Sequence, residues 1–376
     1  MIKLLFFIES LSGGGAENAL VTLIGSLDKE KYDIYLVPLV DMGAFKEGVD
    51  TNAVHYLPVI PSSSGILSAL WGKIKYKLIY RNLPLQFVFK WIMPRMEFDW
   101  SIAFVEGFST KLMAHAPGRK IAWAHTDLAK NPWPLQLGIF KDLKEEIDTY
   151  ACYDKVVCVS RVVEDTMKRL YGLQNTTTLY NIVDRNRIVS LSQLPQQITL
   201  SPGFNIVAVG RLVPQKRFDK LIQIVARLRR EGADAHLYLV GDGPDRAHLE
   251  RLSCDNGTED AVIFTGFLKN PYPLMRNSDL MVSPARAEGF GLVVAEAMVL
   301  GLPVIGMNDS GTAELLGNGR YGELCDSDDA LAAAIRNAAC NAGYLKELEN
   351  RSRQGQAQFD LQKAVEQIES LFDRDA

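Results

Sequence analysis

Two glutamates that flank a glycine-rich turn form the spacing in this sequence that most clearly suggests ligand chemistry. In "PARAEGFGLVVAEAM" (284–298), Glu288 precedes Gly289 and Gly291, and Glu296 lies in the apolar run that follows. That run predicts a buried helix, whose first amide groups attract a phosphate that the glycines allow to come close. We expect Glu288 in the loop and Glu296 about 7–8 Å into the helix, at ~1.5 Å per residue. Two such carboxylates could bind hydroxyls at the two ends of a ligand folded over its pyrophosphate; the alternative is one capping and one solvated acid.

Two cations in "VAVGRLVPQKRFDKLI" could bind such a pyrophosphate. Arg211 offers a planar fork and Lys216 a point charge at the end of an expected strand. Together they suit two phosphate groups and could stabilise their departure. Two cations in a charged turn are also typical of a solvated surface, and the next residue, Arg217, is predicted to face solvent.

Length and composition limit the protein class. A chain of 376 residues with 47% hydrophobic and 23% charged residues predicts a globular protein of two domains. The net charge of −4 gives no reason to expect nucleic acid as a partner, and no apolar run reaches the roughly 18 residues that span a bilayer. The five cysteines show no C-x-x-C spacing, so disulfides and zinc are not expected and a reducing cytoplasm fits best.

Short apolar runs alternate with helical patterns along both halves of the chain, which predicts parallel sheets covered by helices. The pattern restarts after 186–203, a segment rich in Ser, Gln and Pro that is typical of a linker. We therefore predict an α/β protein with two doubly wound domains, 1–185 and 200–355, followed by a helix in 356–376 that packs back on the first domain. Ligands of such sheets bind beyond the carboxyl ends of the strands, which here predicts a site in the cleft between the domains.

Together with two further motifs in the expected order, these segments make the chain resemble the family 4 glycosyltransferases over nearly its whole length. "SLSGGGAENAL" (10–20) resembles the family's G-G-x-E loop, and "IAWAHTDL" places His125 after a strand. The family signature is E-x7-E, and Arg211 with Lys216 matches its R-x4-K. The resemblance implies the GT-B fold, in which two Rossmann-like parallel-sheet domains face each other across a cleft. The first would bind the acceptor and the second the nucleotide-sugar donor, with retention of configuration.

The resemblance also assigns roles to residues. His125 would lie near the anomeric centre, although a lone histidine after a strand is more often structural. With Glu288, Arg211 and Lys216 it makes up the predicted catalytic set. The donor would be bound by Gly14, Gly15, Arg211, Lys216, Gly241, Gly243, Gly266, Phe267, Glu288, Gly289, Phe290, Gly291, Leu292 and Glu296. Thr312 stands where the family more commonly has a second glycine, which leaves donor selectivity open.

Neither a metal nor a cofactor is expected, since cations are already placed for the diphosphate. Asp326-Ser327-Asp328 is superficially similar to the metal-binding D-x-D of the other glycosyltransferase fold. The helical pattern that follows it predicts a helix N-cap instead.

The segment 71–95, "WGKIKYKLIYRNLPLQFVFKWIMPR", carries six basic residues and no acid, interleaved with aromatic residues. This composition suits the surface of an anionic membrane, at about 1 kcal/mol per basic residue near it. A pair of core helices with solvated lysines is the equally weighted alternative. The first reading implies a lipid-linked acceptor and a cytoplasmic protein on the inner face of the plasma membrane.

The sequence therefore predicts a hexosyltransferase of bacterial surface polysaccharide or glycoprotein glycan assembly. A UDP-sugar is the first expectation for the donor and GDP-mannose the second. A non-hydrolysing UDP-sugar epimerase of the same fold and a catalytically silent nucleotide-sugar-binding protein are the alternatives.

Overall fold

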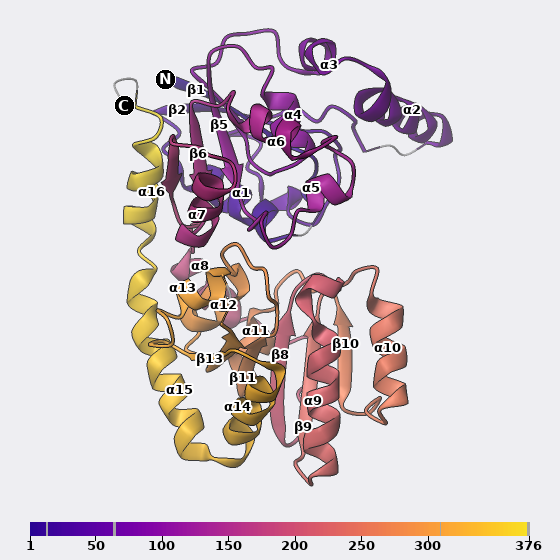
Figure 1. The fold of residues 1–376 in the computed structure, drawn as a ribbon, viewed down its shortest axis with the longest axis vertical. Coiled ribbons are helices and arrows are strands. Elements are labelled where there is room, and N and C mark those ends of the chain that lie inside the picture. Colours follow the sequence, from indigo (N-terminus) through magenta and orange to yellow (C-terminus); the bar gives the residue numbers. More distant parts are fainter. Residues whose placement is uncertain (13, 63–64, 309, 374–376) are drawn as a thin grey trace. The chain divides into compact units, whose positions relative to one another are not determined.

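The computed structural model describes residues 1–12, 14–62, 65–308 and 310–373 of the chain. The chain forms two compact units (Figure 1). The first contains Met1–Ile182 and the C-terminal segment from Gln362, and the second contains Val183–Leu361. Each has its own parallel sheet.

The first unit is built on a seven-stranded sheet of order β3-β2-β1-β4-β5-β6-β7, in which every pairing is parallel. Its central strands are almost wholly apolar because helices cover both faces of such a sheet. The chain order reverses between β1 and β4, where ligands of doubly wound sheets bind. The strands are β1 (Ile2–Ile8), β2 (Tyr32–Pro38), β3 (His55–Tyr56), β4 (Trp100–Ala103), β5 (Arg119–Ala124), β6 (Lys155–Cys158) and β7 (Thr176–Thr178).

The last helix of the chain completes the first unit. Tyr32 and Phe372 meet edge to face at 5.7 Å, and Trp100 Nε1 donates to the Phe372 carbonyl at 3.3 Å. Phe372 is therefore a core residue of the first unit. The helices of this unit are α1 (Gly15–Ser26), α2 (Ile66–Lys77), α3 (Leu85–Ile92), α4 (Phe108–Met113), α5 (Trp133–Gln136), α6 (Leu143–Tyr150), α7 (Arg161–Arg169) and α16 (Leu361–Glu369).

The second unit is built on a six-stranded parallel sheet of order β10-β9-β8-β11-β12-β13. Here the chain order reverses between β8 and β11. Alternate residues of the strands, such as Ile206 and Ala208 or Leu237 and Leu239, join the core under α9 and α14. The strands are β8 (Phe204–Val209), β9 (Ala235–Val240), β10 (Val262–Gly266), β11 (Leu280–Ser283), β12 (Val304–Met307) and β13 (Glu323–Cys325).

The second unit begins with a helix that lies largely within the segment predicted to be a linker. Residues 185–192 form α8, whose N-cap Asp184 accepts a hydrogen bond from the Arg187 amide, so the linker interpretation is wrong for these residues. The helices are α8 (Arg185–Ser192), α9 (Phe218–Arg230), α10 (Arg246–Asp255), α11 (Tyr272–Asn277), α12 (Leu292–Val299), α13 (Ser310–Leu315), α14 (Asp328–Cys340) and α15 (Ala342–Gly355). The prediction of two doubly wound parallel sheets is confirmed.

Candidate active site

The loops that follow β8 and β11 meet at the carboxyl edge of the second sheet. These strands are neighbours at the point where the chain order reverses. Lys216, after β8, forms an ion pair with the carboxylate of Glu288, after β11, and their side chains are only 22% and 15% exposed. The structure therefore brings together two predicted site residues that lie 72 positions apart in the sequence.

Arg211 lies in the same loop as Lys216 but is exposed. Within the described ranges, its guanidinium makes no hydrogen bond or ion pair. An exposed fork of donors with no protein partner can bind an anion at little cost in broken contacts. Arg211 and Lys216 thus lie together at the strand end, as predicted, but differ in how they are bound.

The glycine turn between the two glutamates leads into α12 as expected. Gly291 is the N-cap and has a φ of 85°, in the left-handed region that favours glycine. No side chain caps the helix, so its first amide groups remain available to an anion. Glu288 lies in the loop and Glu296 in the helix, which confirms the predicted placement of both residues. Gly289 and Phe290 are buried in this turn, next to the partly exposed Leu292.

Glu296 is buried, and the Tyr272 hydroxyl donates to its Oε1 at 3.0 Å. Burial raises the pKa of Glu296 to about 7, while the hydrogen bond from Tyr272 acts in the opposite direction. Tyr272, in α11, was not among the predicted site residues. It lies in "NPYPLM", where no spacing or motif indicates a contact with a glutamate 24 positions away.

The glycines after β9 are explained by packing. A side chain at Gly241 would collide with the Gly210 carbonyl, and one at Gly243 with the Leu212 carbonyl. The Gly241 amide also donates to the Gly266 carbonyl at 2.9 Å. These glycines therefore let a second loop press against the loop of Arg211. Phe267, after β10, is 46% exposed at the same edge.

Arg217 does not face solvent, so that prediction is wrong. Its side chain is 14% exposed because Nη2 contacts both carboxylate oxygens of Asp328, at 2.8 and 2.7 Å. The predicted helix cap at 326–328 is confirmed, since Ser327 Oγ accepts a hydrogen bond from the Ala330 amide at 3.1 Å. Within the described part of the chain, no cluster of three or more His, Cys, Asp or Glu could hold a metal ion.

In the first unit, the predicted residues also follow strands at the carboxyl edge. Gly14 is the N-cap of α1 and Gly15 its first residue, and no side chain caps this helix either. His125 directly follows β5, as expected. Burial of its imidazole lowers the pKa to about 3, so the ring is neutral at physiological pH. Its Nε2 is shielded from solvent and has no hydrogen-bond partner among the described residues.

A second unpredicted residue, Glu106, holds the His125 turn in place. Its buried Oε1 accepts hydrogen bonds from the amides of His125 and Thr126, at 2.6 and 2.5 Å. Burial raises the pKa of Glu106 to about 7. A lone glutamate after β4, followed by Gly107, carries no sequence signal that links it to His125.

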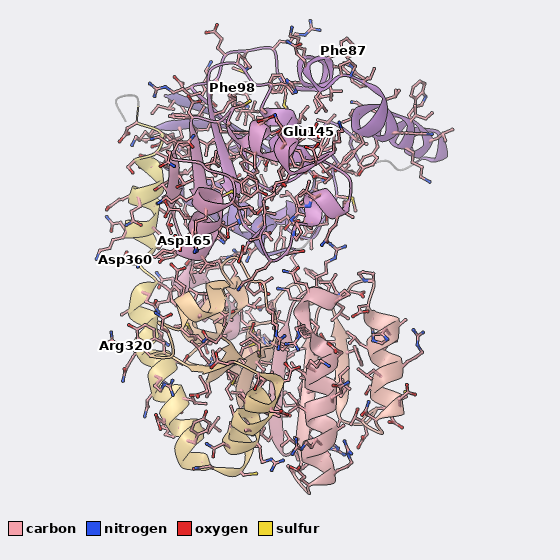
Figure 2. All side chains as sticks on the ribbon, in the orientation of Figure 1. Phe87, Phe98, Glu145, Asp165, Arg320 and Asp360 are labelled. Atoms are coloured by element: carbon pink, nitrogen blue, oxygen red, sulfur yellow. The ribbon has the colours of Figure 1, made fainter. Side chains whose placement is uncertain are left out.

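The basic and aromatic segment 71–95 forms α2, a π-helical turn (Leu78–Asn82) and α3. Its aromatic residues differ in exposure. Tyr80 stacks on Tyr76 at 4.7 Å and on Phe108 at 4.2 Å, and Phe89 is buried, whereas Trp71, Phe87, Trp91 and Tyr76 are 70%, 56%, 45% and 41% exposed. Phe87 projects from α3 in Figure 2. None of the described helices combines the length and apolar character that crossing a bilayer requires.

The two sheets define the class of the protein. A solved structure of Anabaena Alr3699/HepE in complex with UDP and glucose matches 99% of both chains with a TM-score of 0.78, at 22% sequence identity. This likeness shows the GT-B fold. The group 1 glycosyltransferase model ("Glycosyl transferases group 1") matches residues 194–357, and the model "Glycosyltransferase Family 4" matches residues 13–187. The chain belongs to the family 4, group 1 glycosyltransferases.

Two relatives match nearly the whole chain. The lipopolysaccharide core biosynthesis glycosyltransferase LpsD of Rhizobium meliloti is 26% identical over 369 residues, which cover 96% of this chain and 95% of the relative. The N-acetylgalactosamine-N,N'-diacetylbacillosaminyl-diphospho-undecaprenol 4-alpha-N-acetylgalactosaminyltransferase of Campylobacter jejuni is 26% identical over 377 residues, covering 96% and 97%. This chain is therefore similar along its length to enzymes that transfer sugars.

Proposed function

We propose that the protein is a retaining hexosyltransferase that uses a nucleotide-sugar donor, with a UDP-sugar as the first candidate and GDP-mannose as the second. The observation that carries this proposal is the meeting of Lys216 and Glu288 beside an exposed Arg211 at the topological switch point of the second sheet. A cation pair suits a diphosphate, and a neighbouring carboxylate suits sugar hydroxyls. The complex of the Anabaena protein with UDP and glucose supports this choice of ligand.

In this proposal each charged group has one task. Arg211 and Lys216 stabilise the diphosphate as it leaves, and Glu288 with the amides of residues 289–291 binds the sugar. Glu296 binds the ribose hydroxyls. His125, neutral and with Nε2 unpaired, accepts a hydrogen bond from a sugar hydroxyl near the anomeric carbon.

Retention of configuration is proposed to follow same-face attack through an ion-pair-like transition state. No motif in the sequence nominates a carboxylate nucleophile for a double displacement. Leaving-group stabilisation is then the main catalytic contribution, and it comes from the preorganised cations after β8. Because those cations already meet the diphosphate, the proposed reaction needs no metal.

The acceptor is proposed to be lipid-linked, in bacterial surface glycan assembly. The name of the Campylobacter relative specifies a diphospho-undecaprenol acceptor, and α3 presents Phe87 and Trp91 to solvent beside Lys90. A groove of about 650 Å³ under α3 is lined mainly by apolar side chains, and its charged lining residues are Lys90, Arg95 and Glu97. This combination suits an anionic lipid.

A thermal-shift screen tests the donor site. A nucleotide present at about a hundredfold over its Kd should add ~2.7 kcal/mol to the free energy of unfolding. We expect a UDP-sugar or GDP-mannose to raise the melting temperature of the wild type but not of Glu296→Ala or Glu296→Gln. The control is Asp260→Ala, which removes a contact with Arg229 at the amino edge of the same sheet and should respond as the wild type does. A shift that survives in both Glu296 variants would contradict the ribose assignment. Incubation with and without acceptor then separates transfer, isomerisation and silent binding.

Sedimentation with anionic liposomes tests the membrane surface. Lys75 is a poor target because its Nζ donates to the Val59 carbonyl at 2.6 Å and lies 5.5 Å from the Trp91 ring centre. The exposed Lys73, Lys77 and Lys90 are better targets. We expect their replacement by glutamate to abolish sedimentation, whereas unchanged sedimentation would exclude this surface.

A further inference from the structure

Arg217 has a backbone conformation that is unusual for an arginine. Its φ of 56° and ψ of 35° lie in the left-handed region, and within the described residues only Asn318 shares a positive φ without being glycine. Glycine adopts this conformation without a steric penalty, whereas other residues are strained. Strain of this kind persists only where surrounding contacts maintain it, and it is concentrated at functional sites.

The contacts that maintain Arg217 join three loops at the carboxyl edge of the second sheet. Asp328, at the start of α14, contacts Arg217 through both oxygens and also lies 3.2 Å from Arg286 Nη2. Arg217 Nη1 lies 3.4 Å from the Pro284 carbonyl. Arg217 directly follows Lys216, and Arg286 lies two positions before Glu288. The Asp328 carboxylate therefore connects the loop of Lys216 to the loop of Glu288.

A neighbouring hydrogen bond connects the same two loops. Gln215 Nε2 donates to the Ala287 carbonyl at 2.6 Å. Three consecutive residues, 215–217, thus each contact the segment 284–288 or its carboxylate partner, with Lys216 in the middle. Helix capping does not require Asp328 for α14, because Ser327 already caps that helix.

We propose that Arg217, held by Asp328, is a positioning residue that keeps Lys216 and Glu288 at the spacing that a sugar diphosphate requires. The inference rests on the proposed donor site and goes beyond it, because it assigns Arg217 and Asp328 to holding the loops of the site and not to binding sugar or phosphate. Arg217 belongs to no motif identified in the sequence. An arginine in place of the glycine that this backbone favours is explained by its side-chain contacts.

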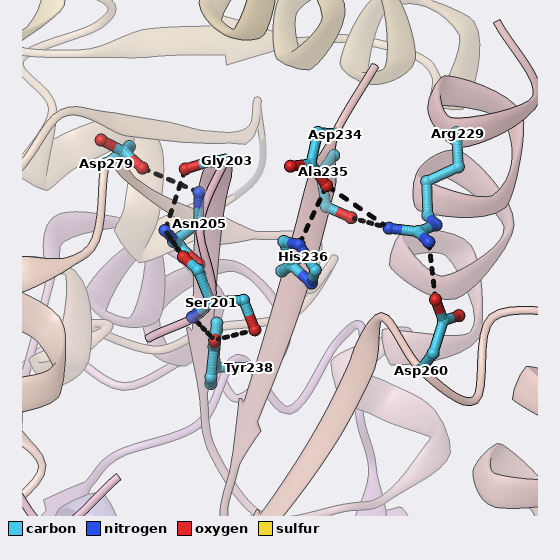
Figure 3. Close-up of polar contacts among 10 residues, drawn as sticks. All are labelled: Ser201, Gly203, Asn205, Arg229, Asp234, Ala235, His236, Tyr238, Asp260 and Asp279. Carbon is cyan, nitrogen blue, oxygen red and sulfur yellow. Dashed lines mark hydrogen bonds and ion pairs between the residues drawn. The ribbon is translucent and has the colours of Figure 1, made fainter. Parts of the chain in front are cut away.

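A matched control lies at the other end of the same helix. Arg217 is the N-cap of α9 and Arg229 lies in its last turn. Arg229 Nη2 contacts Asp260 at 2.7 Å, at the opposite edge of the sheet (Figure 3). Both pairs join an arginine of α9 to an aspartate outside that helix, but only the first lies beside predicted site residues.

The experiment compares Arg217→Gly, Arg217→Ala, Asp328→Asn and the control Arg229→Ala. Dissociation constants are measured by calorimetry for UDP and UMP (or GDP and GMP, if the wild type selects guanine), together with melting temperature. Arg217→Gly relieves the backbone strain but removes the side-chain contacts, so we expect a melting temperature near that of the wild type. We expect its Kd for the diphosphate to rise at least tenfold and its Kd for the monophosphate to change less than threefold. Arg217→Ala and Asp328→Asn should raise the Kd for the diphosphate in the same selective way, although each also lowers the melting temperature, and Arg229→Ala should bind as the wild type does.

Two outcomes would overturn the inference. Wild-type affinity for the diphosphate in Arg217→Gly would show that the contacts position nothing. Equal weakening of diphosphate and monophosphate, accompanied by a fall in the melting temperature of Arg217→Gly, would show a merely structural role. Failure of the proposed function is distinguishable, because a wild type without affinity for either nucleoside diphosphate would remove the donor site itself.

Discussion

The charged groups at the two edges of the second sheet differ in whether they are paired within the protein. Near the amino edge, polar groups are paired within the protein: the Ser201 amide donates to the Tyr238 hydroxyl at 2.7 Å, and Arg229 contacts Asp260 (Figure 3). At the carboxyl edge, Arg211 is exposed without a partner in the described structure, and α12 begins without a side-chain cap. The carboxyl edge therefore presents an exposed guanidinium and a helix start without a side-chain cap, whereas Arg229 at the amino edge is already paired within the protein. This is the difference that we expect between an edge that binds the proposed donor and one that only closes the sheet.

The amino edges of both sheets share one arrangement of hydrogen bonds, in which an aspartate joins two neighbouring strands. An aspartate directly before one strand makes two hydrogen bonds with the second residue of the neighbouring strand: its carboxylate accepts from that residue's amide, and its own amide donates to that residue's carbonyl. The side-chain bonds are Asp99 to the Lys3 amide at 2.8 Å, Asp154 to the Lys120 amide at 2.7 Å and Asp279 to the Asn205 amide at 2.7 Å. Recurrence in two separate sheets indicates a structural role in aligning parallel strands.

The largest effect that separates the two edges should come from Lys216→Met. The substitution removes the cation that stabilises the departing diphosphate, and a loss of about 10²–10³ in kcat is expected for one such group. Arg229→Met, at the amino edge, should change kcat less than twofold. Initial rates with saturating donor measure both. Activity of Lys216→Met within threefold of the wild type would contradict the assignment of the carboxyl edge.

The pH dependence of stability should separate two carboxylates of the carboxyl edge by sign. The folded protein keeps the proton of Glu296 up to about pH 7, whereas the unfolded chain loses it near 4.5. Because the folded state binds more protons in this window, the free energy of unfolding falls as pH rises from 4.5 to 7. The decline due to Glu296 is about 3 kcal/mol, at 1.36 kcal/mol per pKa unit. Urea unfolding of Glu296→Gln at pH 5 and 7.5 should show a smaller decline than the wild type.

Asp328 should behave in the opposite direction. The ion pair with Arg217 lowers its pKa, so its stabilising contribution is present above the ordinary carboxyl pKa and is lost as pH falls through the lowered value. Asp328→Asn should therefore be less stable than the wild type at neutral pH and approach it on acidification. For the preceding prediction, a pH profile of Glu296→Gln that parallels the wild type would contradict the raised pKa of Glu296.

The sequence predicted the central strands of each sheet and the edge strand β10 (Val262–Gly266), but not the other three edge strands. The pattern used for prediction was a continuous apolar run, which central strands show because both of their faces are covered. The strands that this pattern did not predict are β3, β7 and β13. They lie at ends of the two sheets and are two or three residues long. β7 consists of three threonines. A short strand with one neighbour needs little hydrophobic surface, so no apolar run marks it.

The candidate site was predictable where a motif lies within one segment, and not where contacts join distant segments. Gly291, Glu288 and Glu296 could be placed because helix geometry relates residues that are close in sequence. Tyr272, Glu106 and Arg217 were missed or misread, since each acts through a partner at least 19 positions away. Such contacts depend on strand order, which one sequence does not determine.

A smaller loss of stability is expected when one of the aspartates that join neighbouring strands is removed. Asp279→Ala leaves the amide of Asn205 without its side-chain acceptor, and Asn205 is buried. Loss of such a partner costs about 1–3 kcal/mol. Urea unfolding should show this loss, and nucleotide affinity should stay at the wild-type value because the proposed donor site lies at the opposite edge of the sheet. Asp99→Ala and Asp154→Ala should destabilise the first unit comparably; reduced affinity in Asp279→Ala would undermine the contrast between the edges.

The smallest expected effect comes from alanine substitutions at two glycines of the second unit. Comparing them separates the energetic cost of backbone strain from a loss of nucleotide affinity. Gly291, before α12, and Gly232, after α9, have φ values of 85° and 93°, and an added Cβ would meet no atom closer than 3.6 Å at either position. Alanine should therefore cost about 1 kcal/mol at each, through the left-handed backbone alone. Matched thermal melts should show equal destabilisation, while only Gly291→Ala should weaken nucleotide binding, because only its amide lies in the turn that leads into α12. Equal nucleotide affinity in the two variants would mean that the turn between Glu288 and Glu296 serves the helix rather than the ligand.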